Sequence, residues 1–261
     1  MQFEFATASQ LIMSIGVILP RIGGAFLLLP YFNGDTIPPM LRNVFLVSLA
    51  LVLVPYSLQQ PIPPMAGVQL IPLLVKEVFI GVAIGFTFGI VFWAIEGVGQ
   101  VIDTKVGSTT AQLSDPLTGH QTTLIGTFLA RLAGYLFAAF GGLRLFIDLV
   151  LSSFQVWPAM QPLPNLPALG SVFFVHRFDD LMRITLLLSA PVLIALTLLE
   201  VGMGFINRYA PQLNVFTLSM SLKAWLAIFI VLLSLGNMSS FLLDWVGGQH
   251  GLLNTLPLSH R

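Results

Sequence analysis

The sequence predicts an all-α integral membrane protein of about six long, kinked hydrophobic helices arranged in hairpins. Of its 261 residues, 56% are hydrophobic and 8% are charged, whereas an ordinary soluble domain carries about 25% charged residues. The mean hydropathy of +0.91 points the same way. The polar stretches are too short to enclose a core of their own. We therefore expect one membrane domain over residues 1–261.

Six stretches are apolar over roughly 20 residues, the length that a helix needs to cross a bilayer. They cover residues 8–30, 41–57, 68–95, 124–157, 181–206 and 215–246. Several exceed that length, so we expect them to tilt, to break into two helices or to project beyond the lipid. Proline, which kinks a helix, falls inside or at the ends of these stretches at Pro20, Pro55, Pro72 and Pro191.

Most connections between the apolar stretches are short and rich in proline. Residues 158–170 hold four prolines and should form a stiff, extended exterior loop. The final residues, 247–261, contain glycine and histidine, and we expect a mobile tail there.

One segment, residues 96–123, is polar between two apolar stretches. Its charged residues are Glu96, Asp103, Lys105 and Asp115, and glycine, serine and threonine make up much of the rest. A long polar connection of this kind is usually functional or disordered, and so few charges argue against disorder. We therefore expect an ordered loop over residues 96–123 that works inside a membrane assembly.

Charged residues also occur within the apolar stretches, where a charge at the bilayer centre costs roughly 2.5–3.5 kcal/mol. Arg21 and Arg131 lie deepest, so we expect each of them to meet a partner or a polar cavity. Arg144 and Asp148 are four residues apart and should pair on one helix.

Three further charged residues stand near the starts of apolar stretches, namely Lys76, Glu77 and Lys223. A long side chain near the end of a membrane helix can extend its charged group to the interface, which is called snorkelling. We expect this simpler behaviour for all three.

Glycine recurs at every fourth position in the third stretch, at Gly81, Gly85 and Gly89. Such a strip is flat and lets another helix approach closely. It fits ordinary packing within the chain as well as a seam between subunits, and the sequence leaves both alternatives open.

Composition and motifs exclude several classes of function. A formal net charge of zero offers no basic face for nucleic acid, and the absence of cysteine excludes disulfides and thiolate chemistry. The sequence contains no His-Glu-x-x-His, no Gly-x-Ser-x-Gly and no phosphate-binding loop. Its four histidines lack the spacing of metal ligands. We therefore expect no catalytic residue, no cofactor and no metal.

Motifs along nearly the whole chain resemble one family of membrane proteins. They are Pro20-Arg21, Leu41-Arg42-Asn43, Glu96-Gly-Val-Gly-Gln-Val-Ile-Asp103, Asp115-Pro-Leu-Thr-Gly119, Trp157-Pro158 and Asn207-Arg-Tyr-Ala-Pro-Gln-Leu-Asn-Val-Phe216. On these motifs the chain resembles the FliR/SctT family of type III secretion export apparatus proteins. Leu41-Arg42-Asn43 and Trp157-Pro158 look more like the injectisome branch (SctT, YscT, HrcT, SpaR) than like flagellar FliR.

The resemblance implies a multi-pass subunit of an export gate in the bacterial inner membrane. Its fold would be that of a fused FliP-like and FliQ-like subunit. The implied partners are about five FliP-like (SctR) subunits, about four FliQ-like (SctS) subunits and one FlhB-like (SctU) subunit. Unfolded secreted proteins would be the cargo, and membrane lipid would surround the gate.

The resemblance also implies site residues. In the family, the loop between the third and fourth hydrophobic segments plugs the channel, and it maps onto about residues 106–122. The plug residues would be Gly107, Ser108, Thr109, Thr110, Ala111, Asp115, Pro116 and Gly119. Other polar residues would anchor the loop ends as caps or in polar pairs, and these are Glu96, Asp103, Lys105, Glu200, Asn207, Arg208, Pro211 and Asn214.

Two alternatives remain open from the residues. A flagellar export gate would use the same family fold. A secondary transporter would use Glu96 and Glu200 as proton or ion ligands, because each acid is followed by two spaced glycines and then by Ile-Asp or Ile-Asn.

Overall fold

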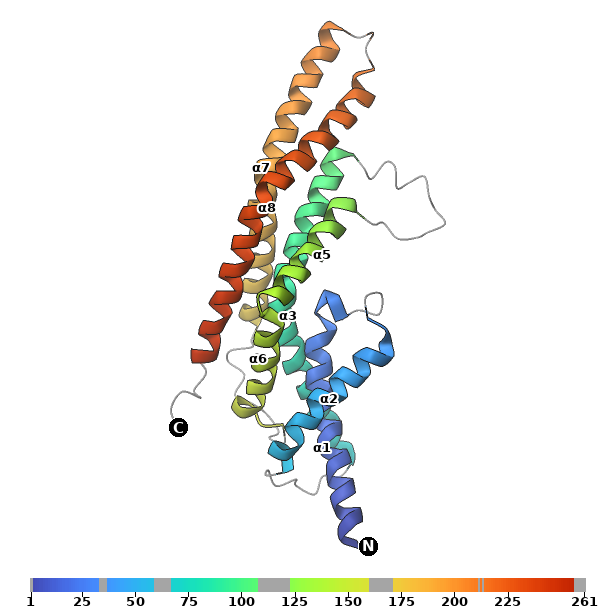
Figure 1. Cartoon of the computed structure of the whole chain (residues 1–261), viewed down its shortest axis with the longest axis vertical. Coiled ribbons are helices and arrows are strands. Elements are labelled where there is room, and N and C mark those ends of the chain that lie inside the picture. Colours follow the sequence, from blue (N-terminus) through green and yellow to red (C-terminus); the bar gives the residue numbers. More distant parts are fainter. Residues whose placement is uncertain are drawn as a thin grey trace. The chain divides into compact units, whose positions relative to one another are not determined.

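The computed structural model describes residues 2–32, 37–58, 67–107, 123–159, 171–210, 212 and 214–255 (Figure 1). Every regular element in these ranges is a helix, which confirms the all-α class. The elements are α1 (Gln2–Leu27), η1 (Pro30–Phe32, a 3₁₀ helix), α2 (Pro39–Leu58), α3 (Gly67–Val106), α5 (Leu124–Ala139), α6 (Gly142–Val156), α7 (Ser171–Tyr209) and α8 (Val215–Thr255).

Fewer helices than expected are long and apolar enough to cross a membrane. Among the described residues, α3, α7 and α8 qualify, and the bent pair of α5 and α6 has the length and composition of a broken span or of a re-entrant loop. The break falls at Gly141, whose φ of +78° lies in the left-handed region that favours glycine. The apolar segments of α1 and α2, Leu11–Leu27 and Pro39–Pro55, are shorter.

The four prolines picked out in the sequence lie inside helices, as predicted. Pro20 is in α1, Pro55 in α2, Pro72 in α3 and Pro191 in α7. Each removes one backbone donor from its helix, so each of these helices carries a weakened point.

The structure corrects two expected boundaries. Helix α3 continues to Val106, so residues 96–106 are helical and the polar segment leaves its helix only at Gly107. Helix α8 continues to Thr255, so much of the expected tail is helical. Residues 108–122, 160–170 and 256–261 lie outside the described ranges.

The chain divides into two compact units, and the single membrane domain over residues 1–261 stays a prediction. Unit 1 comprises Met1–Ile90, Gly141–Arg177 and Gly247–Arg261, and unit 2 comprises Val91–Phe140 and Phe178–Val246. Helices α3 and α7 each contribute residues to both units.

In unit 1, the glycine strip of α3 packs against α1. A Cβ atom on Gly81 would overlap the carbonyl oxygen of Arg21, and one on Gly85 would overlap that of Ala25. From the other side, a Cβ on Gly24 would lie 2.9 Å from the Val78 carbonyl oxygen. The strip therefore serves packing within the chain at these positions, and the absence of side chains lets the two backbones touch.

Aromatic rings join the helices of unit 1. Phe26 of α1 meets Phe32, Phe45 and Phe146 edge to face, with ring centroids 4.6, 5.5 and 5.0 Å apart. Phe146 also meets Phe88 of α3 at 5.0 Å. Such geometry suits the ring quadrupoles, so this cluster fixes α1, α2, α3 and α6 together.

The core of unit 1 also contains a buried charge cluster, which we define as Arg21, Lys76 and Glu77. Arg21 Nε donates to Glu77 Oε2 at 2.6 Å and Nη2 donates to Oε1 at 2.9 Å, while Lys76 Nζ lies 2.8 Å from Oε1. The Arg21 and Glu77 side chains are 0% exposed. Arg21 thus has the partner that its depth predicted, and the snorkelling expected for Lys76 and Glu77 is wrong.

The end of α6 supplies further acceptors to this cluster. Arg21 donates to the Trp157 carbonyl at 2.8 Å and to Ser153 Oγ at 3.2 Å, and Lys76 donates to the Ala159 carbonyl at 2.9 Å. The Arg21 guanidinium also lies 4.0 Å from the centroid of the Phe154 ring, a cation–π contact. The cluster therefore connects α1, α3 and the segment that follows α6.

Candidate functional site

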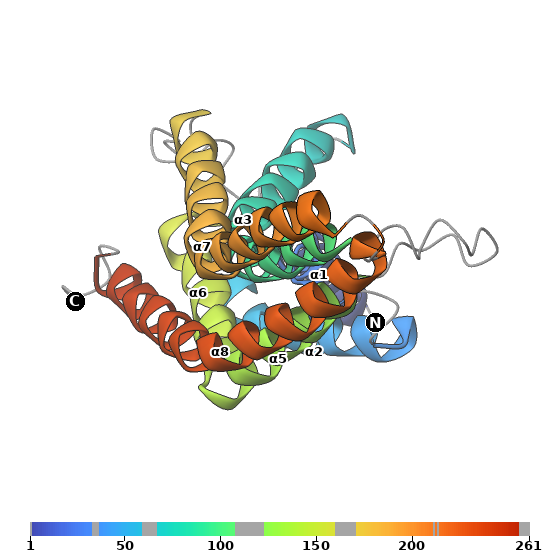
Figure 2. The same ribbon diagram turned by 90° about the horizontal axis from the view of Figure 1, so that it is seen from above.

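Unit 2 brings together the end of α3, all of α5 and most of the long helices α7 and α8. Figures 1 and 2 both show α8 running beside α5. The described part of the chain stops at Gly107 and resumes at Thr123, so the surroundings of these two residues decide how the ends of the polar segment are held.

Asp103 of α3 caps the start of α5. Its Oδ2 accepts the backbone N–H of Ile125 at 2.9 Å and that of Gly126 at 3.3 Å. Thr123, the residue before the helix, makes no side-chain capping bond of its own. The free N–H groups of a first helical turn need acceptors, and a carboxylate there also suits the helix dipole. Asp103 therefore joins two helices while it caps one of them.

The backbones of α3 and α5 also touch beside this cap. A Cβ atom on Gly99 would overlap the backbone of Gly126, so only glycine allows this approach. We call the contact formed by Gly99, Asp103, Ile125 and Gly126 the neck, because it holds the start and the end of the polar segment together.

Gly107 ends α3 just beyond the neck. Its φ is +92°, a conformation that side-chain-bearing residues rarely adopt. Its N–H lies 3.2 Å from the carbonyl oxygens of both Asp103 and Thr104, which closes the last turn of the helix. The polar segment therefore departs from a defined helix end.

Two lysines share one carboxylate next to the neck, and we call Lys105, Glu200 and Lys223 the lysine bridge. Lys105 Nζ lies 2.6 Å from Glu200 Oε2, and Lys223 Nζ lies 2.5 Å from Oε1. The Glu200 side chain is 40% exposed, whereas Lys223 is largely buried. The snorkelling expected for Lys223 is therefore wrong, because this residue pairs inside the chain.

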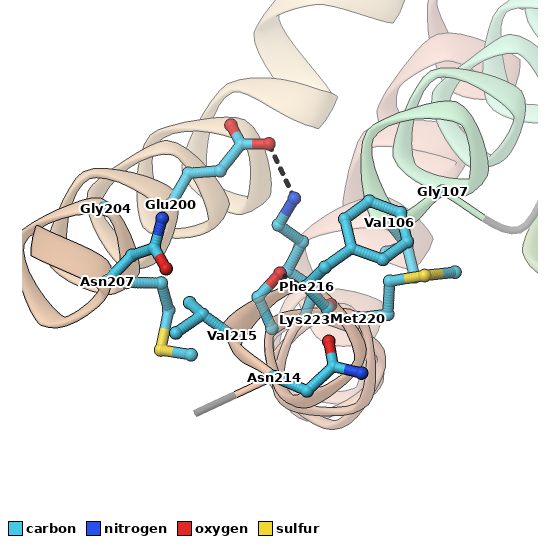
Figure 3. A pocket seen from close by; sticks show the side chains of 12 residues that line it. Val106, Gly107, Glu200, Gly204, Asn207, Asn214, Val215, Phe216, Met220 and Lys223 are labelled. Carbon is cyan, nitrogen blue, oxygen red and sulfur yellow. Dashed lines mark hydrogen bonds and ion pairs between the residues drawn. The ribbon is translucent and has the colours of Figure 1, made fainter. Parts of the chain in front are cut away.

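The lysine bridge borders a cavity of about 550 Å³ between the end of α3, the end of α7 and the start of α8. Figure 3 shows Glu200 and Asn207 on the α7 wall, with Phe216 and Met220 pointing from α8 toward the end of α3. The other lining residues are Val106, Gly107, Met203, Gly204, Asn214, Val215, Ser219 and Lys223. The cavity thus opens beside the point at which the polar segment leaves α3.

The remaining predicted anchors lie in three places. Asn214 precedes α8 and accepts the Thr217 N–H at 3.4 Å, and Glu96 accepts a 3.1 Å bond from Gln100. Asn207 and Arg208 are exposed in the last turn of α7, so they lie on a helix.

Of the predicted plug residues, Gly107 is described. The others, together with the predicted anchor Pro211, lie outside the described residues; they are Ser108, Thr109, Thr110, Ala111, Asp115, Pro116 and Gly119.

Sequence reasoning missed the residues that form the neck with Asp103. Gly99 belongs to a quoted motif, but nothing marked Gly126 as its partner. Thr185 was also missed: its Oγ1 donates to the Ala94 carbonyl at 3.2 Å and its side chain lies against Gly97. The available signal was the pair of helical glycines Gly97 and Gly99, because glycine in a membrane helix often marks a close contact with another helix.

The polar groups of this site hold helix ends in place through caps and ion pairs. Asp103 caps a helix, Lys105 and Lys223 neutralise Glu200, and Asn214 caps α8. The arrangement can fix the end of α3, the start of α5, the end of α7 and the start of α8 beside the cavity, and this structural task is the one that the chemistry supports.

Known proteins resemble the chain along most of its length. The model of the family described as bacterial export proteins, family 1, matches residues 12–247. The surface presentation of antigens protein SpaR of Salmonella typhimurium is 31% identical over 86% of this chain and 83% of its own length. The Yop proteins translocation protein T of Yersinia pestis is 31% identical over 85% of each chain.

A flagellar protein is similar as well. The flagellar biosynthetic protein FliR of Bacillus subtilis is 28% identical over 79% of this chain and 80% of its own length. The injectisome relatives are thus slightly closer by identity than this flagellar one. The chain therefore belongs to the bacterial export proteins of family 1, the FliR/SctT family of type III secretion export apparatus proteins.

Proposed function

We propose that this protein is a structural and gating subunit of a type III secretion export gate, without catalytic activity of its own. It helps to form the channel through which unfolded proteins cross the bacterial inner membrane. The observation that carries this proposal is the family match over residues 12–247, which includes nearly all of both units. The three long apolar helices support a place in a membrane.

We assign the protein to an injectisome. SpaR and the Yop translocation protein T are each 31% identical to it, against 28% for the flagellar relative. Leu41-Arg42-Asn43 and Trp157-Pro158 favour the same branch. The flagellar export gate is the second candidate, since the family model does not separate the two systems.

Exposed apolar surface supports partners in a larger assembly. In the most apolar windows of α7 and α8, 17% and 22% of residues are buried, against 72% in α3. Large exposed apolar surfaces mark contacts with other proteins or with lipid. About five FliP-like, about four FliQ-like and one FlhB-like subunit, together with lipid, would cover them.

We further propose that residues 107–122 act as the channel plug. The neck holds both ends of this segment, and the lysine bridge ties Lys105, two residues before Gly107, to α7 and α8. A plug must move while its base stays fixed, and this part of unit 2 supplies such a base.

The transporter alternative draws less support from the geometry. Glu200 is neutralised by two lysines and Glu96 accepts a bond from Gln100. A coupled ion would have to displace these partners before it could bind either carboxylate.

The composition of the purified complex tests the proposal. A tagged chain, expressed together with the neighbouring export genes of its host, is purified in mild detergent and weighed by native mass spectrometry. We expect one copy of this chain with several copies of two smaller hydrophobic subunits. Recovery of a monomer or a homodimer without other subunits would overturn the proposal.

A further inference from the structure

One face of α5 presents an exposed stripe with a charge in its middle. Leu124, Phe128, Arg131 and Tyr135 stand at i, i+4, i+7 and i+11, and these spacings fall on one side of a helix. All four are exposed, Leu124 at 79% and Tyr135 at 72%. We call them the α5 stripe.

An apolar groove lies beside the first turns of the stripe. It has a volume of about 260 Å³ between α5 and α8, which run side by side in Figures 1 and 2. Its lining residues are Leu124, Ile125, Phe128, Ile228, Val231 and Leu232. Arg131 follows Phe128 by about one helical turn, so a guanidinium stands next to one end of an apolar groove.

Arg131 differs from four other cations of the apolar helices. Arg21, Lys76, Lys105 and Lys223 each meet a carboxylate within the chain. In the parts of the chain that the structure describes, Arg131 forms no such ion pair.

Neither lipid nor water suits the α5 stripe. Lipid would leave the guanidinium without partners, at a high cost, and water would leave Leu124, Phe128 and Tyr135 unburied. A protein surface that is apolar and carries one carboxylate satisfies both requirements, because charge complementarity then selects the partner.

We propose that the α5 stripe and its groove are the docking site for an apolar helix of a neighbouring export-gate subunit. That helix carries an Asp or Glu that pairs with Arg131, about one turn from the apolar side chain that fills the groove. The inference rests on the proposed function, since the partner is a subunit of the gate, and it names the chemistry by which this face recognises that subunit.

Substitutions at Arg131 in the co-expressed complex test the pairing. We expect Arg131→Leu to weaken recovery of the partner subunit by roughly 30-fold or more, the usual effect of removing one member of a buried charge pair. Arg131→Glu should be worse, and Arg131→Lys should retain much of the binding. Arg144→Leu is the matched control, because Arg144 is exposed and has Asp148 as its own partner 3.8 Å away; it should leave recovery unchanged.

Photo-crosslinking then identifies the partner residue. With p-benzoylphenylalanine in place of Phe128, ultraviolet light should join the chain to a partner helix, and mass spectrometry should map the adduct within a turn or two of an acidic residue. Exchanging the charges, Arg131→Glu here with that acid changed to Arg, should restore assembly. This rescue separates a lost contact from a misfolded chain.

The possible outcomes distinguish failure of the docking site from failure of the proposed function. Full assembly of Arg131→Leu, failure of the charge exchange, or a crosslink only to lipid or within the chain would overturn the docking site while leaving the proposed function intact. If the wild-type chain itself recovers no partner, the proposed function fails instead.

Discussion

Two charge clusters with the same balance of charges occur in the two units of this protein, and they differ in burial. The buried charge cluster (Arg21, Lys76 and Glu77) and the lysine bridge (Lys105, Glu200 and Lys223) each combine two cations with one carboxylate. The Glu77 side chain is 0% exposed and that of Glu200 is 40% exposed.

That difference assigns the clusters different tasks. Removing one member of a buried pair leaves an uncompensated charge in the core, whereas water can replace a lost partner in an exposed pair. The buried charge cluster therefore holds unit 1 together, whereas the lysine bridge contributes less to stability and fixes the point at which the polar segment leaves α3.

The largest effect is expected from Glu77→Gln, which leaves Arg21 and Lys76 facing each other without an acid. We expect a loss of about 3–5 kcal/mol in the free energy of unfolding, measured as a large drop in the thermal midpoint of the purified chain and in its yield. The triple variant Arg21→Met, Lys76→Met, Glu77→Leu is the control. It removes every charge and should recover most of the loss, and a Glu77→Gln variant as stable as wild type would contradict the assigned role.

A smaller effect is expected at the neck. Gly99→Ala places a methyl group against the backbone of Gly126, and overpacking of this kind costs roughly 1–3 kcal/mol. The thermal midpoint should fall, and trypsin should cleave more readily after Lys105, the one Lys or Arg within residues 96–123. Gly202→Ala is the matched control, because a Cβ at Gly202 has no neighbour within 4 Å. Equal midpoints for the two variants would show that the neck is not a close contact.

The smallest change in stability is expected from Glu200→Gln. The Glu200 carboxylate is 40% exposed, so water can reach the site and the thermal midpoint should fall less than in Glu77→Gln. The loss of both lysine contacts should instead loosen the base of the polar segment, and we expect a higher resting ion leak in cells that carry the assembled gate. Glu96→Gln is the control, because Glu96 also precedes two spaced glycines but accepts its bond from Gln100, and it should leave the leak unchanged. A large loss of stability in Glu200→Gln would show that the lysine bridge stabilises the fold as strongly as the buried charge cluster does.

The sequence predicted the fold class and most helices, because a helix that crosses a membrane must be apolar over about 20 residues and the hydropathy of the sequence shows such stretches. It also showed that Arg21 needs a partner, since a deep charge is costly. It did not identify Glu77, which lies 56 residues away and is brought close only by packing between α1 and α3. Lys76, Glu77 and Lys223 were misjudged for a related reason: distance from the start of a helix does not tell which face is buried.

The start of the polar segment was misplaced for another physical reason. Polar composition between residues 96 and 106 predicted a loop, but a helix satisfies its own backbone and needs partners only for its side chains. Asp103 finds them at the start of α5, and Lys105 finds Glu200 on α7. The Lys-Glu-Lys arrangement and the contact between Gly99 and Gly126 join residues far apart in sequence, so no local pattern could reveal them.

The most direct test of the central claim is the ion conductance of the resting gate when residues 108–119 are deleted. The neck lies outside the deletion, and residues 120–122 remain to connect Gly107 to Thr123, so the complex should still assemble with its normal subunit composition. We predict that this assembled gate leaks ions where the wild-type gate is closed. A deletion complex that assembles fully and stays as tight as wild type would contradict the role of this segment as the plug.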